Sequence, residues 1–168
     1  MRAISHAQFV AVHAVGRPSR QPEKGEVAVA SINTRGVVVG GLVAGLIINI
    51  SEYILNEPVL GSDVAAAMTA HNLPPIGGSA IVVFMILGFV VGVALLWLYA
   101  AMRPRFGAGP KTAAIAAMVV WFLDYFCGAV AFGAVGLFSA RLIIIGLLWG
   151  LVELVVAALV GGRLYSEA

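Results

Sequence analysis

Four apolar segments, each long enough to cross a lipid bilayer, dominate the sequence. They cover residues 36–56, 79–102, 112–135 and 142–163. A transmembrane helix needs about 20 apolar residues to cross about 30 Å of hydrocarbon. Backbone groups in lipid must be satisfied within the segment, and the apolar residues form continuous runs rather than an alternating pattern, so we predict helices and exclude a β-barrel. The predicted fold is all-α, an integral membrane four-helix bundle.

The composition agrees with this class. Hydrophobic residues make up 61% of the 168-residue chain and charged residues only 11%, whereas soluble domains carry about a quarter charged residues. A water-soluble globular domain is therefore excluded. We predict one membrane domain, residues 35–168, which lipid surrounds.

Residues 1–34 lie outside this pattern and have three interpretations. The first is a polar, disordered cytoplasmic tail. The second is an organellar transit peptide, because Arg and Ser occur here with no acidic residue before Glu23. The third is a non-native start: Lys24-Gly25-Glu26 can be encoded by a purine-rich ribosome-binding site, and GTG start codons can encode Val27 or Val29. Mass spectrometry of the natural N-terminus distinguishes a start near Val27 from the other two.

The distribution of basic residues predicts the orientation. Nine of the ten Lys and Arg residues precede the first span, lie between the second and third, or close the fourth, and only Arg141 lies in another loop. The positive-inside rule then places both termini in the cytoplasm. These anchors account for the net charge of +2, so we expect no nucleic-acid partner.

Three acidic residues, Glu52, Asp124 and Glu153, lie within the spans, and no Lys, Arg or His lies at the same depth. An ionisable group inside a membrane is costly and is a functional-site hypothesis by default. In each helix the acid shares a face with small residues, where helices approach closely. The three faces are Gly41, Gly45, Asn49, Glu52 and Asn56 in the first span, Ala113, Ala117, Trp121, Asp124 and Gly128 in the third, and Gly146, Gly150, Glu153 and Ala157 in the fourth.

The positions along the helices predict how the acids are held. Asp124 and Glu153 are both near mid-bilayer on adjacent antiparallel helices, so we expect them to meet, protonated, as a pair that shares a proton. Glu52 is nearer the outer surface, within reach of Arg141, Tyr53 or Tyr125. Two roles for these acids stay open: a purely structural one, and one in binding or moving protons or solutes. The predicted polar interior comprises Glu52, Asp124, Glu153, Asn49, Tyr53 and Tyr125.

Glycines at helical spacing predict the helix contacts. The second and fourth spans each contain a Gly-x-x-x-Gly pattern, which lets backbones approach closely. A shift of 72 residues also aligns the first span with the third, which suggests an old duplication of a helical hairpin. The expected packing glycines are Gly41, Gly45, Gly88, Gly92, Gly146 and Gly150.

Several chemistries are disfavoured by the residues present. No His in any span could bind haem, Cys127 is the single cysteine, and no nucleotide-binding or zinc-protease motif occurs. We therefore expect no catalytic residues, metal or cofactor, and consider an enzyme the less probable class.

The segment from Gly41 to Glu52, with Trp97 to Arg105 and Gly146 to Glu153, resembles small bacterial inner-membrane proteins of uncharacterised function. The resemblance covers residues from about 31 onward and implies a multi-pass protein of the bacterial inner membrane, with no activity attached. Two function hypotheses follow. The first is a non-catalytic component that acts through helix–helix contacts with itself or a membrane complex. The alternative is a small proton-linked transporter or channel that acts as an oligomer.

Overall fold

The computed structural model describes residues 31–167, and within them all regular structure is helical. The all-α prediction is therefore confirmed, while the predictions for residues 1–30 lie outside the described residues. The elements are, in order, α2 (Thr34–Ile54), the π-helical segment η1 (Leu55–Val59), α3 (Gly61–Ala70), α4 (Gly78–Phe106), α5 (Pro110–Trp121), the π-helical segment η2 (Phe122–Phe126), α6 (Cys127–Ala134) and α7 (Ala140–Leu164).

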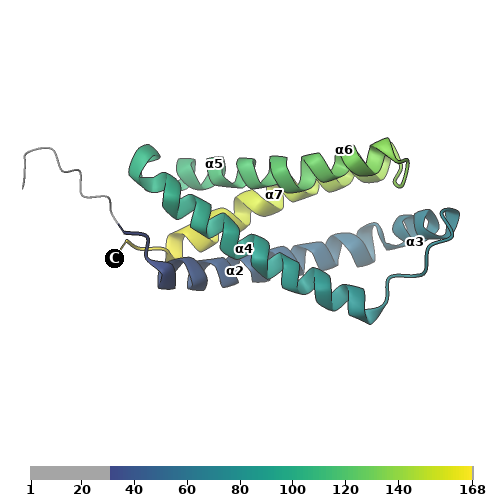
Figure 1. Ribbon diagram of the computed structural model, residues 1–168, viewed down its shortest axis with the longest axis horizontal. Coiled ribbons are helices and arrows are strands. Elements are labelled where there is room, and N and C mark those ends of the chain that lie inside the picture. Colours follow the sequence, from purple (N-terminus) through teal and green to yellow (C-terminus); the bar gives the residue numbers. More distant parts are fainter. Residues whose placement is uncertain (1–30, 168) are drawn as a thin grey trace, which may run out of the picture.

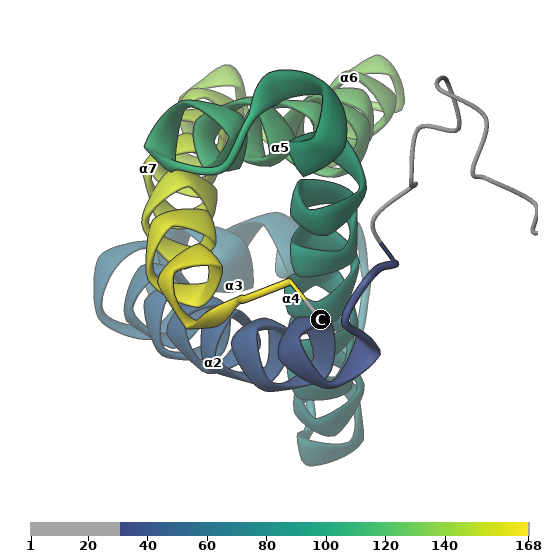
Figure 2. The ribbon, with the colours of Figure 1, turned by 90° about the vertical axis from the view of Figure 1, so that its left-hand side faces the viewer.

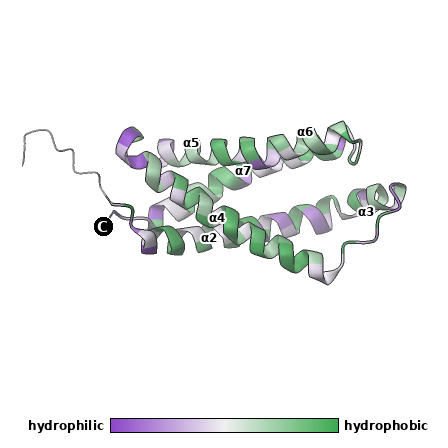
Figure 3. Cartoon of the chain, viewed as in Figure 1, coloured by the Kyte–Doolittle hydropathy of each residue, from purple (hydrophilic) through white to green (hydrophobic). Residues whose placement is uncertain are grey.

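Four continuous helical stretches are long and apolar enough to span a membrane, as predicted. They are Thr34–Val59, Gly78–Phe106, Pro110–Ala134 and Ala140–Leu164. Figure 3 shows hydrophobic residues along all four, with a hydrophilic stretch in the half of α2 that leads to α3. That stretch contains Asn49, Ser51 and Glu52, so the polar residues interrupt an otherwise apolar surface at one level of the bundle.

The four spans form a square in which each helix contacts the next. Viewed along the bundle, α2, α4, α5 and α7 occupy the four corners in that order (Figure 2). Both ends of the described chain and the α4–α5 connection lie at the same end of the bundle (Figure 1). Because every span reverses the direction of the one before it, α2 and α7 also run antiparallel.

Local sequence sets the helix ends. The side chain of Asn33 accepts a hydrogen bond from the backbone N–H of Gly36 and caps α2, and Ser139 caps α7 in the same way. Gly107 and Gly109, with φ of 83° and 132°, form the turn that leads to Pro110 at the start of α5.

The first π-helical segment, η1, contains a proline. Pro58 has no N–H to donate, and its ring would clash with the carbonyl four residues earlier in an α-helix. The wider π turn accommodates the ring, and the N–H of Leu60 donates to the carbonyl of Leu55 at 2.8 Å. A shift of 72 residues places η2 opposite residues 50–54, just before η1, so the proposed duplication stays a prediction.

Side-chain burial is concentrated toward the end of the bundle where the described chain begins and ends. In α4 the first buried residue is Gly88 and in α7 it is Gly150, whereas α6 has none. We call the part with most of the buried residues the packed half and the remainder of the four spans, where Leu55 is buried, the open half. The hydrophobic core of the packed half consists of Val37, Ala44, Ile48, Leu95, Leu96, Tyr99, Ala100, Ala113, Ala116, Ala117, Leu154, Ala157, Ala158 and Tyr165.

Glycines bring the backbones of α2 and α4 into contact. A Cβ atom added to Gly41 would lie 2.6 Å from Cα of Val93, and one added to Gly45 would lie 2.7 Å from Cα of Phe89. Gly92 of α4 faces the backbone of α2 at the same crossing. Such spacing leaves no room for a side chain, so these glycines pack helix against helix as predicted.

A second glycine crossing joins α2 to α7 and was not predicted. A Cβ atom on Gly40 would lie 2.7 Å from the carbonyl oxygen of Gly161, and the reverse distance is the same. Small residues one helical turn apart indicate such a crossing: Gly40 and Ala44 in α2, and Ala157 and Gly161 in α7.

Candidate functional site

Tyr125 joins two of the predicted acids across three helices. Its hydroxyl oxygen lies 2.8 Å from Oε1 of Glu52 and 2.7 Å from Oε1 of Glu153. Glu52 belongs to α2, Tyr125 to η2 and Glu153 to α7. All three lie at the boundary between the packed and open halves, and we call them the acid cluster.

Counting hydrogen atoms constrains the protonation of the acid cluster. A phenol has one hydrogen to donate, and an ionised carboxylate can only accept. Both short contacts of Tyr125 are hydrogen bonds only if one carboxyl group carries a proton and donates it to the phenol oxygen. A complete acid cluster therefore holds two hydrogens, one on Tyr125 and one on Glu52 or Glu153.

An amide extends the acid cluster toward the open half. Nδ2 of Asn56 donates to Oε2 of Glu52 at 2.7 Å and to the backbone carbonyl of the same residue at 3.0 Å. Asn49, which was predicted to belong to the same interior, points elsewhere. Its Nδ2 donates to the carbonyl of Gly45 at 2.8 Å and to that of Met85 on α4 at 3.2 Å, so Asn49 links α2 to α4.

Glu153 is the most enclosed acid. The residue is 4% exposed, and its second carboxyl oxygen, Oε2, is buried with no hydrogen-bond partner in the described part of the chain. A buried polar atom without a partner costs free energy and calls for an explanation. It therefore marks the place in this site where a further group could bind.

A groove between α2 and α7 reaches Glu153. Its volume is about 470 Å³. Nε1 of Trp149 donates to Oγ of Ser51 at 2.8 Å across the two helices. The lining residues are Ile47, Ser51, Ile145, Leu148, Trp149, Val152, Glu153 and Val156. Ser51 was not predicted from the sequence, although it adjoins Glu52. Trp149 lies one helical turn from Glu153.

The expected pair of Asp124 and Glu153 is not formed, and this corrects the predicted arrangement of the interior. Asp124 is exposed and makes no side-chain hydrogen bond within residues 31–167, whereas Tyr125 contacts Glu153. The physical reason is the π turn of η2, which has more residues per turn than an α-helix. Counting from Trp121 at α-helical spacing predicts residue 124 inside, but the wider turn puts residue 125 there.

Gly150 provides the space for the Tyr125 ring. A Cβ atom added to Gly150 would overlap the ring at its Cε1 and Cδ1 atoms. Gly146, which was also predicted to pack helices, has no atom within 4 Å of such a Cβ atom. The Gly-x-x-x-Gly pattern of α7 therefore has one position in tight contact, and that position faces the acid cluster.

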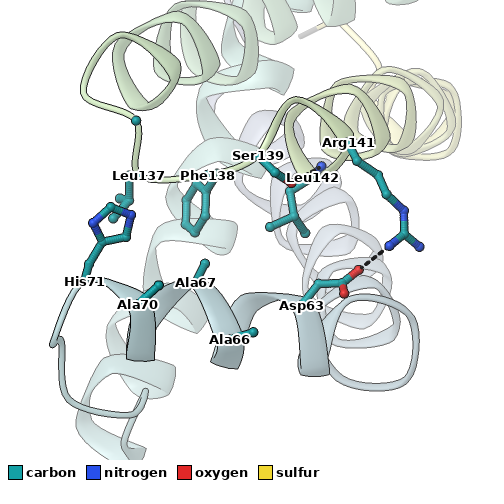
Figure 4. A pocket seen from close by; sticks show the side chains of 11 residues that line it. Asp63, Ala66, Ala67, Ala70, His71, Leu137, Phe138, Ser139, Arg141 and Leu142 are labelled. Atoms are coloured by element: carbon teal, nitrogen blue, oxygen red, sulfur yellow. Dashed lines mark hydrogen bonds and ion pairs between the residues drawn. The ribbon is translucent and has the colours of Figure 1, made fainter.

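Two other predicted contacts differ in the structure. Tyr53 is 68% exposed and makes no side-chain hydrogen bond in the described region. Arg141, expected within reach of Glu52, instead forms an ion pair with Asp63 of α3 at 3.0 Å. Figure 4 shows this pair at one side of a pocket of about 450 Å³ between α3 and the α6–α7 connection. The pocket lies at the end of the bundle and its lining does not include the acid cluster.

Within residues 31–167, no group of three or more His, Cys, Asp or Glu residues could hold a metal ion. Comparison of the chain with protein families, characterised proteins and solved structures finds no match.

Proposed function

We propose that this multi-pass membrane protein is a small proton-linked transporter or channel. The observation that carries the proposal is the acid cluster: two carboxyl groups at membrane depth, joined by one tyrosine hydroxyl, whose hydrogen bonds require a bound proton. A buried carboxyl that keeps a proton and lies next to a groove can exchange that proton when a solute binds. Intramembrane acids that line such paths are typical of proton relays.

The packing supports this function over a purely structural one. Five of the six predicted packing glycines are in contact within the chain: Gly41, Gly45 and Gly92 at the α2–α4 crossing, Gly88 against Asn49, and Gly150 against Tyr125. Filled glycine faces cannot also serve as the contact surface of another protein.

We further propose that the packed half faces the cytoplasm of a bacterial inner membrane. The support is the charge distribution, since five of the six Lys and Arg residues within residues 31–167 lie at that end of the bundle and only Arg141 lies at the other. The open half then faces outward, and the acid cluster lies at the boundary between the two halves.

Proton flux into proteoliposomes tests the proposal. A potassium gradient with valinomycin drives protons inward, and a trapped pH-sensitive dye reports their entry, without solute and with panels of organic cations and anions. We expect flux with the wild type, its loss in Glu153→Gln, and its retention in Glu57→Gln. Glu57 lies in η1 outside the acid cluster and makes a matched control. Equal flux in all three proteins under every condition would reject a proton-linked function.

The non-catalytic membrane component remains a second candidate, favoured by one surface. Seven consecutive residues of α4, Ile81–Leu87, are each 45–57% exposed, so other helices within residues 31–167 leave much of this segment uncovered. A second copy or a membrane complex could cover it. Cross-linking in native membranes from a cysteine placed at Val83 tests this, and recovery of the monomer alone would exclude it.

A further inference from the structure

We propose that the groove between α2 and α7 binds an organic ammonium ion with an apolar body, held by the carboxyl group of Glu153. This inference names a ligand class for the acid cluster and so rests on the proposed function.

The groove has the size and chemistry of a small-molecule site. Its volume of about 470 Å³ lies within the usual range of about 300–1,000 Å³ for ligand pockets, which are mostly apolar with a few polar groups. Ile47, Ile145 and Val156 supply apolar walls. Ser51 and Glu153 supply the polar groups.

The groove opens at the side of the bundle, toward lipid. Leu148 and Val152 line it and are 63% and 65% exposed. These residues lie one turn apart on the outward face of α7, in the middle of a membrane-spanning helix. A ligand that enters here comes from the bilayer, which selects for molecules with a large apolar part.

The carboxyl group of Glu153 has one oxygen atom that could accept a hydrogen bond from a ligand. Its Oε1 contacts Tyr125, while Oε2 has no hydrogen-bond partner in the described chain. Oε2 is covered in the free groove, but the terminal torsion of a Glu side chain is soft, so the carboxyl group can rotate to bring this oxygen to a ligand. An N–H donor would satisfy it.

Charge decides between the possible donors. The spans around the acid cluster contain two carboxyl groups and the further acid Asp124, and no Lys, Arg or His lies at their depth. An anionic ligand would be repelled, and a neutral alcohol would add a hydrogen bond without a countercharge. An ammonium ion supplies both the hydrogen bond and the positive countercharge. The indole of Trp149, which also lines the groove, attracts cations.

Binding of a matched pair of probes tests the inference. We would measure 1-adamantylammonium and 1-adamantanol, which share one shape, by calorimetry on the purified full-length protein in uncharged detergent. The wild type should bind the ammonium about tenfold more tightly than the alcohol, or more, which corresponds to about 1.4 kcal/mol. Glu153→Gln should lose that preference, and the control Glu57→Gln should keep it.

A second variant keeps the test decisive if Glu153→Gln does not fold. Val156→Trp fills the groove and leaves the acid cluster intact, so it should abolish binding of the ammonium. Equal affinity for the two probes, tighter binding of the alcohol, absence of ammonium binding, or unchanged binding in Val156→Trp would each overturn the inference. The binding assay needs no proton gradient, so the two proposals can be tested separately. Loss of ammonium binding with proton flux intact rejects only the ligand class. Ammonium binding without proton flux rejects the proposed function.

Discussion

At the scale of single residues, Tyr125 holds the site together. Its hydroxyl contacts carboxyl groups from α2 and α7, so one side chain links three helices. The sequence pointed to Tyr125 only as a neighbour of Glu52. What it did not reveal is that a phenol, rather than a second carboxyl group, would face Glu153.

Removing the hydroxyl gives the first prediction. Tyr125→Phe keeps the ring against Gly150 but breaks both hydrogen bonds. We expect the free energy of unfolding to fall by about 0.6–1.7 kcal/mol, the range for interhelical hydrogen bonds in membranes. Equilibrium unfolding in mixed detergent micelles measures this, with Tyr53→Phe as the control because Tyr53 is exposed. Equal stability of the two variants would show that the Tyr125 contacts do not stabilise the fold.

The exposed position of Asp124 gives the second prediction. Asp124→Leu removes a carboxyl group that has no hydrogen-bond partner within residues 31–167, so stability should change by less than about 0.5 kcal/mol or increase. Glu153→Leu, in contrast, breaks the hydrogen bond between Glu153 and Tyr125 and should cost about 1 kcal/mol. The same unfolding assay compares them. If Asp124→Leu lowers the free energy of unfolding by 1 kcal/mol or more, Asp124 makes stabilising contacts in the interior, contrary to its exposed position.

At the scale of elements, the four spans could be predicted because their lengths and apolar runs follow from the thickness of the bilayer. The π turns could not. No proline marks η2, and the contact of its Tyr125 ring is with Gly150 of another helix, 25 residues further along the chain. In α2, which is regular up to Ile54, Gly41 and Gly45 lie in the helix contact, whereas Tyr53 faces outward. Around Asp124 the inward position was shifted by one residue.

Two glycines of α7 give the third prediction, since they share a helix and differ in surroundings. Gly150→Ala would overlap the Tyr125 ring and should cost about 1–3 kcal/mol of stability, as overpacking does. Gly146→Ala meets no atom within 4 Å and should be neutral or slightly stabilising, because Ala favours helix. Unfolding of both variants provides the measurement. A larger loss in Gly146→Ala than in Gly150→Ala would contradict the described packing.

At the scale of the whole molecule, both ends of the described chain and the α4–α5 connection lie together (Figure 1). The charge distribution assigns that end to the cytoplasm, and this assignment is the fourth prediction. Reporter fusions at Gly107 and at the C-terminus should be cytoplasmic, and a fusion at Gly77 should be external. Alkaline phosphatase and fluorescent-protein activities measure the two sides. Activity of the phosphatase at Gly107 would reverse the orientation.

The uneven burial along the bundle also has a consequence for the surrounding lipid. In the packed half, side chains of neighbouring helices fill the space between them, so acyl chains touch only the outside. In the open half, where α6 and the first turns of α4 and α7 bury nothing, acyl chains must supply the missing van der Waals contacts. The volume and tension of one leaflet then act directly on the separation of the helices next to the acid cluster, and the opposite leaflet has far less influence on it.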